Sequence, residues 1–219
     1  MSFIDKRIYS VNSLKGFYHV YDSTRGRYLT LNSRFIGLHP HHRNLKRTYF
    51  YDLISKLKQD RDHIKQALVF GLGTNTLQNL IFKNFPEAKI TTIENDPTLI
   101  DIYNYFFEID KNTKQKLIVS DAFQFVKNYE QVFDFHNYFD LVVVDFNLLG
   151  SDFYSEVFLK EIKNFLKPHG TFVLVLNRGG GLQNTETMKF VERLSVYYNK
   201  INLLYSKSGI LEVFCNDSK

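Results

Sequence analysis

Cysteine is nearly absent from this sequence, and so are long apolar runs. Among 219 residues there is a single cysteine, Cys215, which excludes an internal disulfide and any zinc cluster built from several cysteines. No stretch approaches the ~18 uninterrupted apolar residues that a membrane-spanning helix needs. The first residues, Met-Ser-Phe-Ile-Asp-Lys-Arg, lack the apolar centre of a signal peptide. We therefore expect a cytoplasmic protein without a membrane partner.

The composition is that of an ordinary globular chain, but its charge is unevenly distributed. Hydrophobic residues make up 44% and charged residues 23%, which is typical of globular domains. Residues 1–65 contain 13 Lys/Arg against 5 Asp/Glu, whereas residues 66–219 contain 15 against 18. A basic front portion could attract anionic substrates or nucleic acid. Because no RNA-binding or helix-turn-helix pattern accompanies it, we interpret it as a solvated surface, with nucleic acid as the alternative.

The first 46 residues predict a small β-rich module. Apolar and aromatic runs at 17–21 and 27–31 flank a turn ending at Gly26, which predicts a hairpin; an earlier strand is expected near 8–11. A histidine-rich segment, 37–42, follows. Three histidines in four positions suggest a metal, but Pro40 interrupts regular backbone and no carboxylate lies close in sequence. We interpret this segment as a structural loop and expect no metal.

Residues 47–219 alternate between strand and helix patterns and form the predicted second domain. Alternation of this kind predicts a doubly wound, mostly parallel, Rossmann-like sheet with helices on both faces. A terminal antiparallel hairpin is expected to complete it. The predicted strands are 67–70, 89–93, 116–119, 141–144, 171–176, 201–205 and 210–215, and the predicted helices lie near 47–58, 75–84, 97–107, 122–129, 155–166 and 185–198.

A glycine turn after the first of these strands is the centre of the functional prediction. Gly71 and Gly73 follow the strand 67–70, so the turn can be tight and a ligand can approach bare backbone. Glu94 ends the next strand about 20 positions later, where an acidic residue can accept both hydroxyls of a ribose. The third glycine of a dinucleotide fingerprint is missing, and no P-loop lysine follows. The pattern favours a nucleoside site over a purely structural turn, with Thr74 or Thr76 capping the next helix.

Two more carboxylates fall at successive strand ends. Asp121 follows the strand 116–119 and Asp145 follows the strand 141–144; Asn147 and Asn177 supply further polar groups. Asp121 could instead serve as a helix N-cap. Crowding like charges costs energy unless a ligand or cation shares them, and ligands of doubly wound sheets lie at the carboxyl ends of the strands. We therefore expect a common ligand-facing site.

The ordered set of motifs resembles the class I methyltransferase fold, and most closely its spermidine synthase (polyamine aminopropyltransferase) branch. The motifs are Gly71-Leu-Gly73, Ile93-Glu94-Asn95-Asp96, Ser120-Asp121-Ala122, Val143-Val-Asp145 and the run 165–171. The front module also resembles the first hairpin of that family. The resemblance covers residues 17–180.

The resemblance implies a transferase that uses S-adenosylmethionine or its decarboxylated form as co-substrate. Glu94, within the acidic motif that includes Asn95, would bind the ribose hydroxyls. Asp121 and Ala122 would contact the adenine. Gly71 and Gly73 would admit the tail of the cofactor, and Asp145 would lie beside the sulfonium. A sulfonium is already an activated leaving group, so alignment of an unprotonated nucleophile is the main requirement, and Asp145 is the candidate to orient or deprotonate an incoming amine. A small-molecule acceptor and a homodimer are the implied partners.

Departures from the family leave the acceptor open. Where the family has a further Asp three residues beyond Asp145, this chain has Leu148, and the aromatic-acidic patch on the first helix reads Phe50-Tyr51-Asp52. A polycation needs several carboxylates, so the loss argues against putrescine. Two alternatives remain: a methyltransferase of nucleic acid or protein, and a non-catalytic binding or assembly protein that kept the fold.

Overall fold

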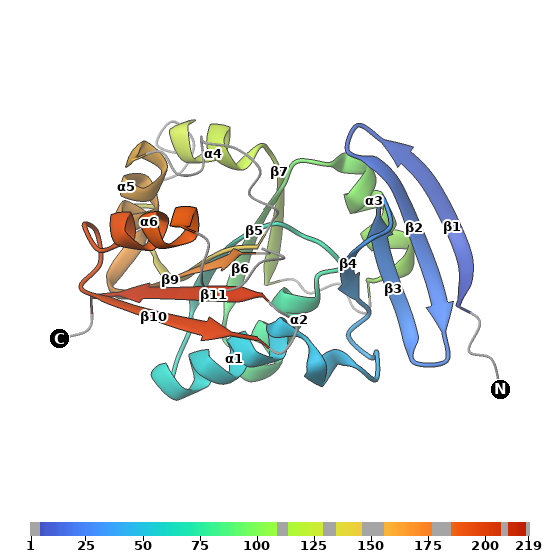
Figure 1. Ribbon diagram of the computed structural model, residues 1–219, viewed down its shortest axis with the longest axis horizontal. Coiled ribbons are helices and arrows are strands. Elements are labelled where there is room, and N and C mark those ends of the chain that lie inside the picture. Colours follow the sequence, from blue (N-terminus) through green and yellow to red (C-terminus); the bar gives the residue numbers. More distant parts are fainter. Residues whose placement is uncertain are drawn as a thin grey trace.

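The computed structural model describes residues 5–108, 114–128, 135–145, 156–176, 185–206 and 210–217. These residues build two sheets (Figure 1): a four-stranded sheet in the order β1-β2-β3-β4, and a seven-stranded sheet in the order β10-β11-β9-β8-β5-β6-β7. The α/β class, the separate N-terminal module and the C-terminal antiparallel hairpin predicted from the sequence are confirmed. The division at residues 46 and 47 stays a prediction.

The N-terminal sheet is an antiparallel meander. Its strands are β1 (Lys6–Ser13), β2 (Gly16–Ser23), β3 (Gly26–Leu31) and β4 (Arg34–Leu38). The sequence predicts the first three but misses β4, because a short run containing Gly37 gives no clear alternation. The glycine has a packing reason: a Cβ at Gly37 would lie 2.3 Å from the hydroxyl of Thr74.

The large sheet joins a parallel centre to the terminal hairpin. Strands β5, β6, β7, β8 and β9 pair in parallel, whereas β11 pairs antiparallel with both β9 and β10. Its strands are β5 (Gln66–Phe70), β6 (Lys89–Glu94), β7 (Gln115–Val119), β8 (Phe139–Val144), β9 (Leu166–Leu176), β10 (Lys200–Tyr205) and β11 (Leu211–Asn216). Helices are η1 (Leu45–Arg47), α1 (Tyr49–Asp60), α2 (Thr76–Asn84), α3 (Pro97–Phe106), α4 (Ala122–Asn128), α5 (Glu156–Phe165) and α6 (Thr185–Leu194).

Predicted boundaries differ from the structure most clearly around β9. Helix α5 ends at Phe165 as expected, but residues 167–170 belong to the strand and do not form a turn. Lys167 donates to Asp140 on β8 at 2.7 Å, and Leu166 pairs with Phe139 across a register shift. This early pairing extends β9 through a segment whose Pro and Gly predict an irregular connection.

Hydrophobic clusters cover both faces of the large sheet. One cluster packs α4 and α5 against one face, and the other packs α1 and α2 against the opposite face. A third cluster joins the N-terminal sheet to α3 and includes Tyr18, Val20, Leu29, Leu99 and Phe107. Among the described residues, no helix is both long and apolar enough to cross a membrane.

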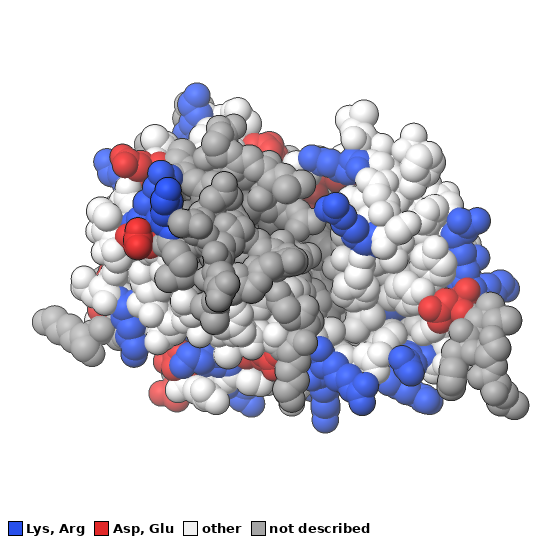
Figure 2. Space-filling model, viewed as in Figure 1, with Lys and Arg blue, Asp and Glu red and all other residues white. Residues whose placement is uncertain are grey.

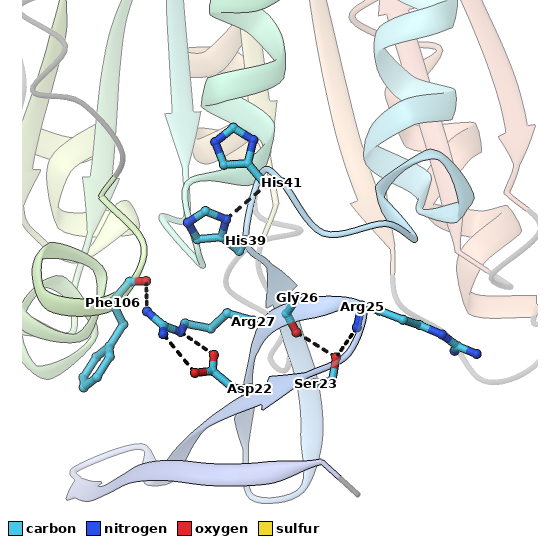
Figure 3. A network of polar contacts seen from close by, with 8 residues as sticks. All are labelled: Asp22, Ser23, Arg25, Gly26, Arg27, His39, His41 and Phe106. Carbon is cyan, nitrogen blue, oxygen red and sulfur yellow. Dashed lines mark hydrogen bonds and ion pairs between the residues drawn. The ribbon is translucent and has the colours of Figure 1, made fainter. Parts of the chain in front are cut away.

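Arg27 fastens the N-terminal sheet to the end of α3 (Figure 3). Its guanidinium donates to both carboxylate oxygens of Asp22, at 2.7 and 3.0 Å, and to the carbonyl of Phe106 at 3.0 Å. The Phe106 carbonyl belongs to the last turn of α3, where a cation is favoured by the helix dipole. The paired carboxylate keeps the guanidinium oriented, so the module is held by polar contacts as well as by apolar packing.

Candidate functional site

A row of backbone hydrogen bonds connects the carboxyl ends of four neighbouring strands. The amide of Asp145 donates to Phe70, that of Gly71 to Ile93, and that of Ser120 to Glu94, each at 2.9 Å. Neighbouring strands lie about 4.8 Å apart. Asp145, the glycine turn, Glu94 and the start of α4 therefore follow one another along a single edge of the sheet. The strand-end residues expected to share a site are placed at that edge.

The glycine turn adopts backbone that other residues avoid. Gly71 and Gly73 have φ values of +105° and +53°, which explains why glycine is needed at both. Asn75 also has positive φ, at +60°, and its buried amide is held by Tyr103 at 3.1 Å and Gln115 at 3.0 Å. These two hydrogen bonds tie the turn to α3 and to β7.

The two threonines of this turn do not cap α2, so that expectation was wrong. Asn75 occupies the N-cap position and makes no side-chain cap. The hydroxyls of Thr74 and Thr76 donate instead to the carbonyl of Leu38, at 2.9 and 2.5 Å. Because Leu38 ends β4, the N-terminal sheet is bonded directly to the proposed cofactor turn.

Glu94 is buried and folded back against the turn. Its Oε2 accepts from the amide of Leu72 at 3.0 Å, and its Oε1 accepts from the amides of Asn95 and Asp96 at 2.8 and 2.9 Å. A carboxylate has about four acceptor positions, so Oε2 keeps one for a ligand hydroxyl. The Asn95 side chain is exposed, whereas Asp96 caps α3 by accepting from Thr98 at 2.9 Å.

Asp121 has the helix-capping role that the sequence left open. Its Oδ1 accepts from the amides of Phe123 and Gln124 at 2.9 and 3.0 Å, which satisfies two free donors at the start of α4. The side chain is exposed, and Ala122 is half-buried. Capping occupies one oxygen, so Oδ2 is the atom by which Asp121 would meet an adenine.

Asp145 is paired with a tyrosine that the sequence analysis did not single out. The phenol of Tyr49, at the start of α1, donates to Oδ1 at 2.9 Å and lies 3.2 Å from Oδ2. Desolvation raises the pKa of Asp145 to about 6, against the lowering effect of the Tyr49 hydrogen bond. Burial and the neighbouring carboxyl raise the pKa of Tyr49 well above 10, so the phenol stays a donor. A carboxyl with a pKa near neutrality suits proton transfer.

A second acidic residue, Glu212 on β11, lies close enough to Asp145 to be influenced by its charge. The sequence analysis did not select it. It is fully buried, and burial followed by the charges of Asp52 and Asp145 raises its pKa to about 9. One signal was available in the sequence: an acidic residue interrupts the apolar run 210–215. A strand in that run buries both faces, so its glutamate could not reach solvent. Asn147, Leu148 and Asn177 lie outside the described residues.

The histidine-rich segment makes contacts of its own. His39 Nδ1 accepts from the amide of His41 at 3.2 Å (Figure 3), and His42 Nδ1 accepts from the amide of Asn44 at 3.1 Å. Backbone donors thus occupy a ring nitrogen on each of two histidines. Nowhere in the described ranges do three or more His, Cys, Asp or Glu side chains form a group that could hold a metal.

The Lys and Arg side chains do not form a single patch on the visible face. Figure 2 shows Lys and Arg side chains around the rim of the part built by the N-terminal sheet, separated by uncharged surface. A nucleic-acid-binding face requires clustered charge, and the face in Figure 2 does not carry such a cluster.

A Rossmann-like sheet with a glycine turn, an acidic residue ending the second strand and a carboxylate ending the fourth defines the class of S-adenosylmethionine-dependent transferase folds. Residues 52–205 match the spermine/spermidine synthase domain. The chain belongs to this family.

Curated relatives include both kinds of transferase. An eEF1A lysine and N-terminal methyltransferase homolog of Drosophila melanogaster is 30% identical over 125 residues, which cover 53% of this chain and 18% of the relative. A polyamine aminopropyltransferase of Sulfurisphaera tokodaii is 23% identical over 169 residues, covering 73% of this chain and 51% of the relative. The chain thus spans about a fifth of the former and about half of the latter.

Solved structures agree on the fold. Spermidine synthase from Thermotoga maritima superposes with a TM-score of 0.77 at 16% identity, covering 99% of this chain and 75% of that one. Human methyltransferase-like protein 13, in complex with SAH, gives a TM-score of 0.68 at 18% identity, covering 78% and 82%. The spermidine synthase likeness includes the N-terminal sheet, because it extends over nearly the whole chain.

Proposed function

We propose that this chain binds S-adenosylmethionine or its decarboxylated form and transfers an alkyl group, aminopropyl or methyl, to an amine. The observation that carries the proposal is the row of strand ends, with Glu94 beside the glycine turn and Asp145 beneath Tyr49. Asp145 and Glu94 end strands that are separated by β5. Two strand spacings, about 10 Å, suit a nucleoside whose ribose is at one end and whose sulfonium is at the other.

In this proposal each residue has a distinct role. Glu94 accepts from a ribose hydroxyl through the free position of Oε2, and Asn95 lies beside it. Asp121 accepts from the exocyclic amine of adenine through Oδ2, and Ala122 contacts the ring. Gly71 and Gly73 leave space for the cofactor tail, because neither carries a Cβ.

Asp145 acts on the acceptor. The amine nitrogen attacks the carbon bound to the sulfonium, a new C–N bond forms, and the C–S bond breaks with its electron pair left on sulfur. The nitrogen then carries an extra proton and can keep it as an ammonium, because an aliphatic amine is more basic than a carboxyl whose pKa lies near 6. Only an unprotonated amine has the lone pair required, so orienting that form is the main contribution of the carboxylate.

A second candidate is methyl transfer to a protein amine. The 30% identical stretch shared with the lysine and N-terminal methyltransferase homolog favours it. The Lys and Arg side chains on the face in Figure 2 are dispersed and give no comparable support to a nucleic-acid substrate. The implied homodimer would form through the N-terminal sheet, and a sedimentation measurement tests that association.

Titration calorimetry with the two sulfonium compounds tests the proposal. Tight binding of the decarboxylated form favours aminopropyl transfer, and tight binding of S-adenosylmethionine favours methyl transfer. If neither compound nor methylthioadenosine binds, both enzyme functions are excluded and the non-catalytic alternative stands.

A further inference from the structure

A cavity of about 320 Å³ lies on the N-terminal sheet, outside the candidate site described above. Tyr28 of β3 and Phe35 of β4 form an aromatic wall, and the turn between β2 and β3 and the loop after β4 supply polar groups. Sites for small molecules have volumes of about 300–1,000 Å³. The cavity is at the lower end of this range, so a ligand that fits it is small.

The cavity and the glycine turn lie on opposite sides of β4. Phe35 lines the cavity, whereas a Cβ placed on Gly73 would lie 3.9 Å from the side chain of the next residue, Ile36. Successive side chains of a strand point to opposite faces. Among the described residues, Ile36 packs against the cluster that joins this sheet to α3, and Tyr28 and Phe35 do not belong to that cluster. The cavity is thus separate from the residues proposed to bind the cofactor.

His42 offers a hydrogen-bond donor to this cavity. It lines the cavity and is only 7% exposed. Its Nδ1 accepts from the amide of Asn44 at 3.1 Å, so the proton of the neutral ring is on Nε2. Burial, and then the charge of Arg25, lowers the pKa of His42 below its usual 6.5, so the ring is neutral at pH 7. Nε2 has no hydrogen-bond partner among the described residues and is available to a ligand.

Arg25 supplies a permanent positive charge at the same cavity. Its carbonyl accepts from the amide of Arg43 at 2.8 Å, which holds the loop after β4 beside the turn between β2 and β3. In Figure 3 the Arg25 side chain points away from the pair formed by Asp22 and Arg27. A guanidinium is always ionised, and it binds carboxylates through two parallel N–H bonds.

An acidic residue, Asp5, also lines the cavity and limits the charge of a ligand. Asp5 accepts from the phenol of Tyr28 at 2.8 Å, and its charge acts against that of Arg25 on the pKa of His42. One guanidinium beside one carboxylate favours a monoanion over a dianion such as phosphate, because like charges repel. The aromatic wall favours a ring attached to that anion, since aromatic pairs gain energy beyond their buried area.

We propose that this cavity is a binding site for a small aromatic monocarboxylate. Arg25 and the Nε2–H group of His42 bind the carboxylate, and the ring packs against Tyr28 and Phe35. The site goes beyond the proposed alkyl transfer and does not depend on it, because it shares no residue with the edge of the sheet where Glu94, Asp121 and Asp145 lie.

An NMR titration of the isotope-labelled full chain with phenylacetate tests this inference. Phenethylamine is the matched ligand, because it has the same ring and a cation in place of the carboxylate. Inorganic phosphate is an anion without a ring. We expect phenylacetate to bind about 10–100-fold more tightly than phenethylamine, as charge-assisted hydrogen bonds predict, and to bind more tightly than phosphate. The amide signals that move should belong mainly to residues 23–28 and 35–44.

Two pairs of variants locate the binding groups. Arg25→Gln should weaken phenylacetate binding about tenfold or more, because the charge-assisted hydrogen bonds are lost. Arg43→Gln is its control, since Arg43 is exposed on the neighbouring loop and is not one of the lining residues. Phe35→Leu, at a position 49% exposed, should weaken binding about 2–10-fold. Phe17→Leu, on the same sheet and 55% exposed, should leave binding unchanged.

Three results would overturn the proposal: no saturable shift with phenylacetate, equal affinity for phenylacetate and phenethylamine, or an Arg25→Gln variant that binds phenylacetate as tightly as Arg43→Gln does. Phosphate binding as tight as that of phenylacetate would show that the ring contributes nothing, which contradicts the assigned ligand class. Because none of these titrations contains a sulfonium compound, the proposed transfer can fail while this site is retained, and the reverse.

Discussion

Tyr49 and Asp145 are 96 residues apart in the sequence and are joined by a hydrogen bond of 2.9 Å. The bond fixes the carboxyl at the end of β8 against the first turn of α1. It also opposes the effect of burial, because it lowers a pKa that desolvation raises to about 6.

Replacing Tyr49 by Phe should move the acidic limb of the rate profile to higher pH. Loss of the bond leaves desolvation unopposed, so the pKa of Asp145 rises. For a rise of about one unit, the ionised fraction falls about fivefold at pH 6 and about twofold at pH 7. The measurement is kcat/KM for alkyl transfer between pH 5 and 8. Tyr51→Phe is the control, since Tyr51 is exposed on the same helix; an unmoved limb in Tyr49→Phe would refute the coupling.

Glu94→Ala should reduce affinity for the sulfonium cofactor by more than about tenfold, because a ribose acceptor and its charge are lost. The amides of Leu72, Asn95 and Asp96 would also lose their acceptor, so the melting temperature should fall.

Glu94→Gln separates these two effects. The amide group keeps one acceptor oxygen for the backbone but no charge, so stability should be retained better than cofactor affinity. Calorimetry and thermal unfolding on the same samples provide the comparison. Cofactor affinity equal to wild type in Glu94→Ala would show that the ribose assignment is wrong.

Glu212→Gln should stabilise the free protein in a pH-dependent manner. The pKa of Glu212 is raised from 4.5 to about 9 on folding, so wild-type stability is unaffected below about pH 4 and is lost progressively as pH rises toward 9. At pH 7 the expected difference is roughly 3 kcal/mol in favour of Gln. Urea unfolding at pH 4, 7 and 9 measures it. A gap that stays constant with pH would mean that Glu212 is not held protonated.

Gly37→Ala should destabilise the junction between β4 and the glycine turn. The new methyl group would lie 2.3 Å from the Thr74 hydroxyl, and overpacking of this kind costs about 1–3 kcal/mol. The double variant with Thr74→Ala should recover part of the loss, because the closest atom is removed. The non-additivity in urea unfolding measures the contact, and strictly additive effects would argue against it.

The large sheet was predictable because buried parallel strands leave a strong signal. The runs ending at Phe70 and Val144 are almost wholly apolar, and their order with helical segments fixes the topology. Strand β4 gave no such signal, because it is short and contains Gly37. The reason for that glycine is its close approach to Thr74, 37 positions further along the chain, which the local sequence does not reveal.

Only those residues of the candidate site that directly follow a predicted strand could be selected from the sequence. Glu94, Asp121 and Asp145 could be selected because each closes an apolar run, although their roles stay predictions. Tyr49 could not be selected, because nothing in the local sequence distinguishes a tyrosine at the start of a helix. Its importance depends on the hydrogen bond to Asp145, which only the folded chain brings close. The position of Glu212 relative to Asp145 depends on the register between β11 and β9, and local sequence carries no information about that pairing.

The shared acceptor at Leu38 has a thermodynamic consequence. Two threonines beside the glycine turn donate to the carbonyl that ends β4, so any ligand that orders this turn also favours docking of the meander. By linkage, removing the meander must weaken the affinity for such a ligand by the same factor. If the proposed sulfonium compound binds at this turn, the amide hydrogens of β4 should exchange more slowly in its presence, even though no atom of that strand has been assigned a contact with the ligand.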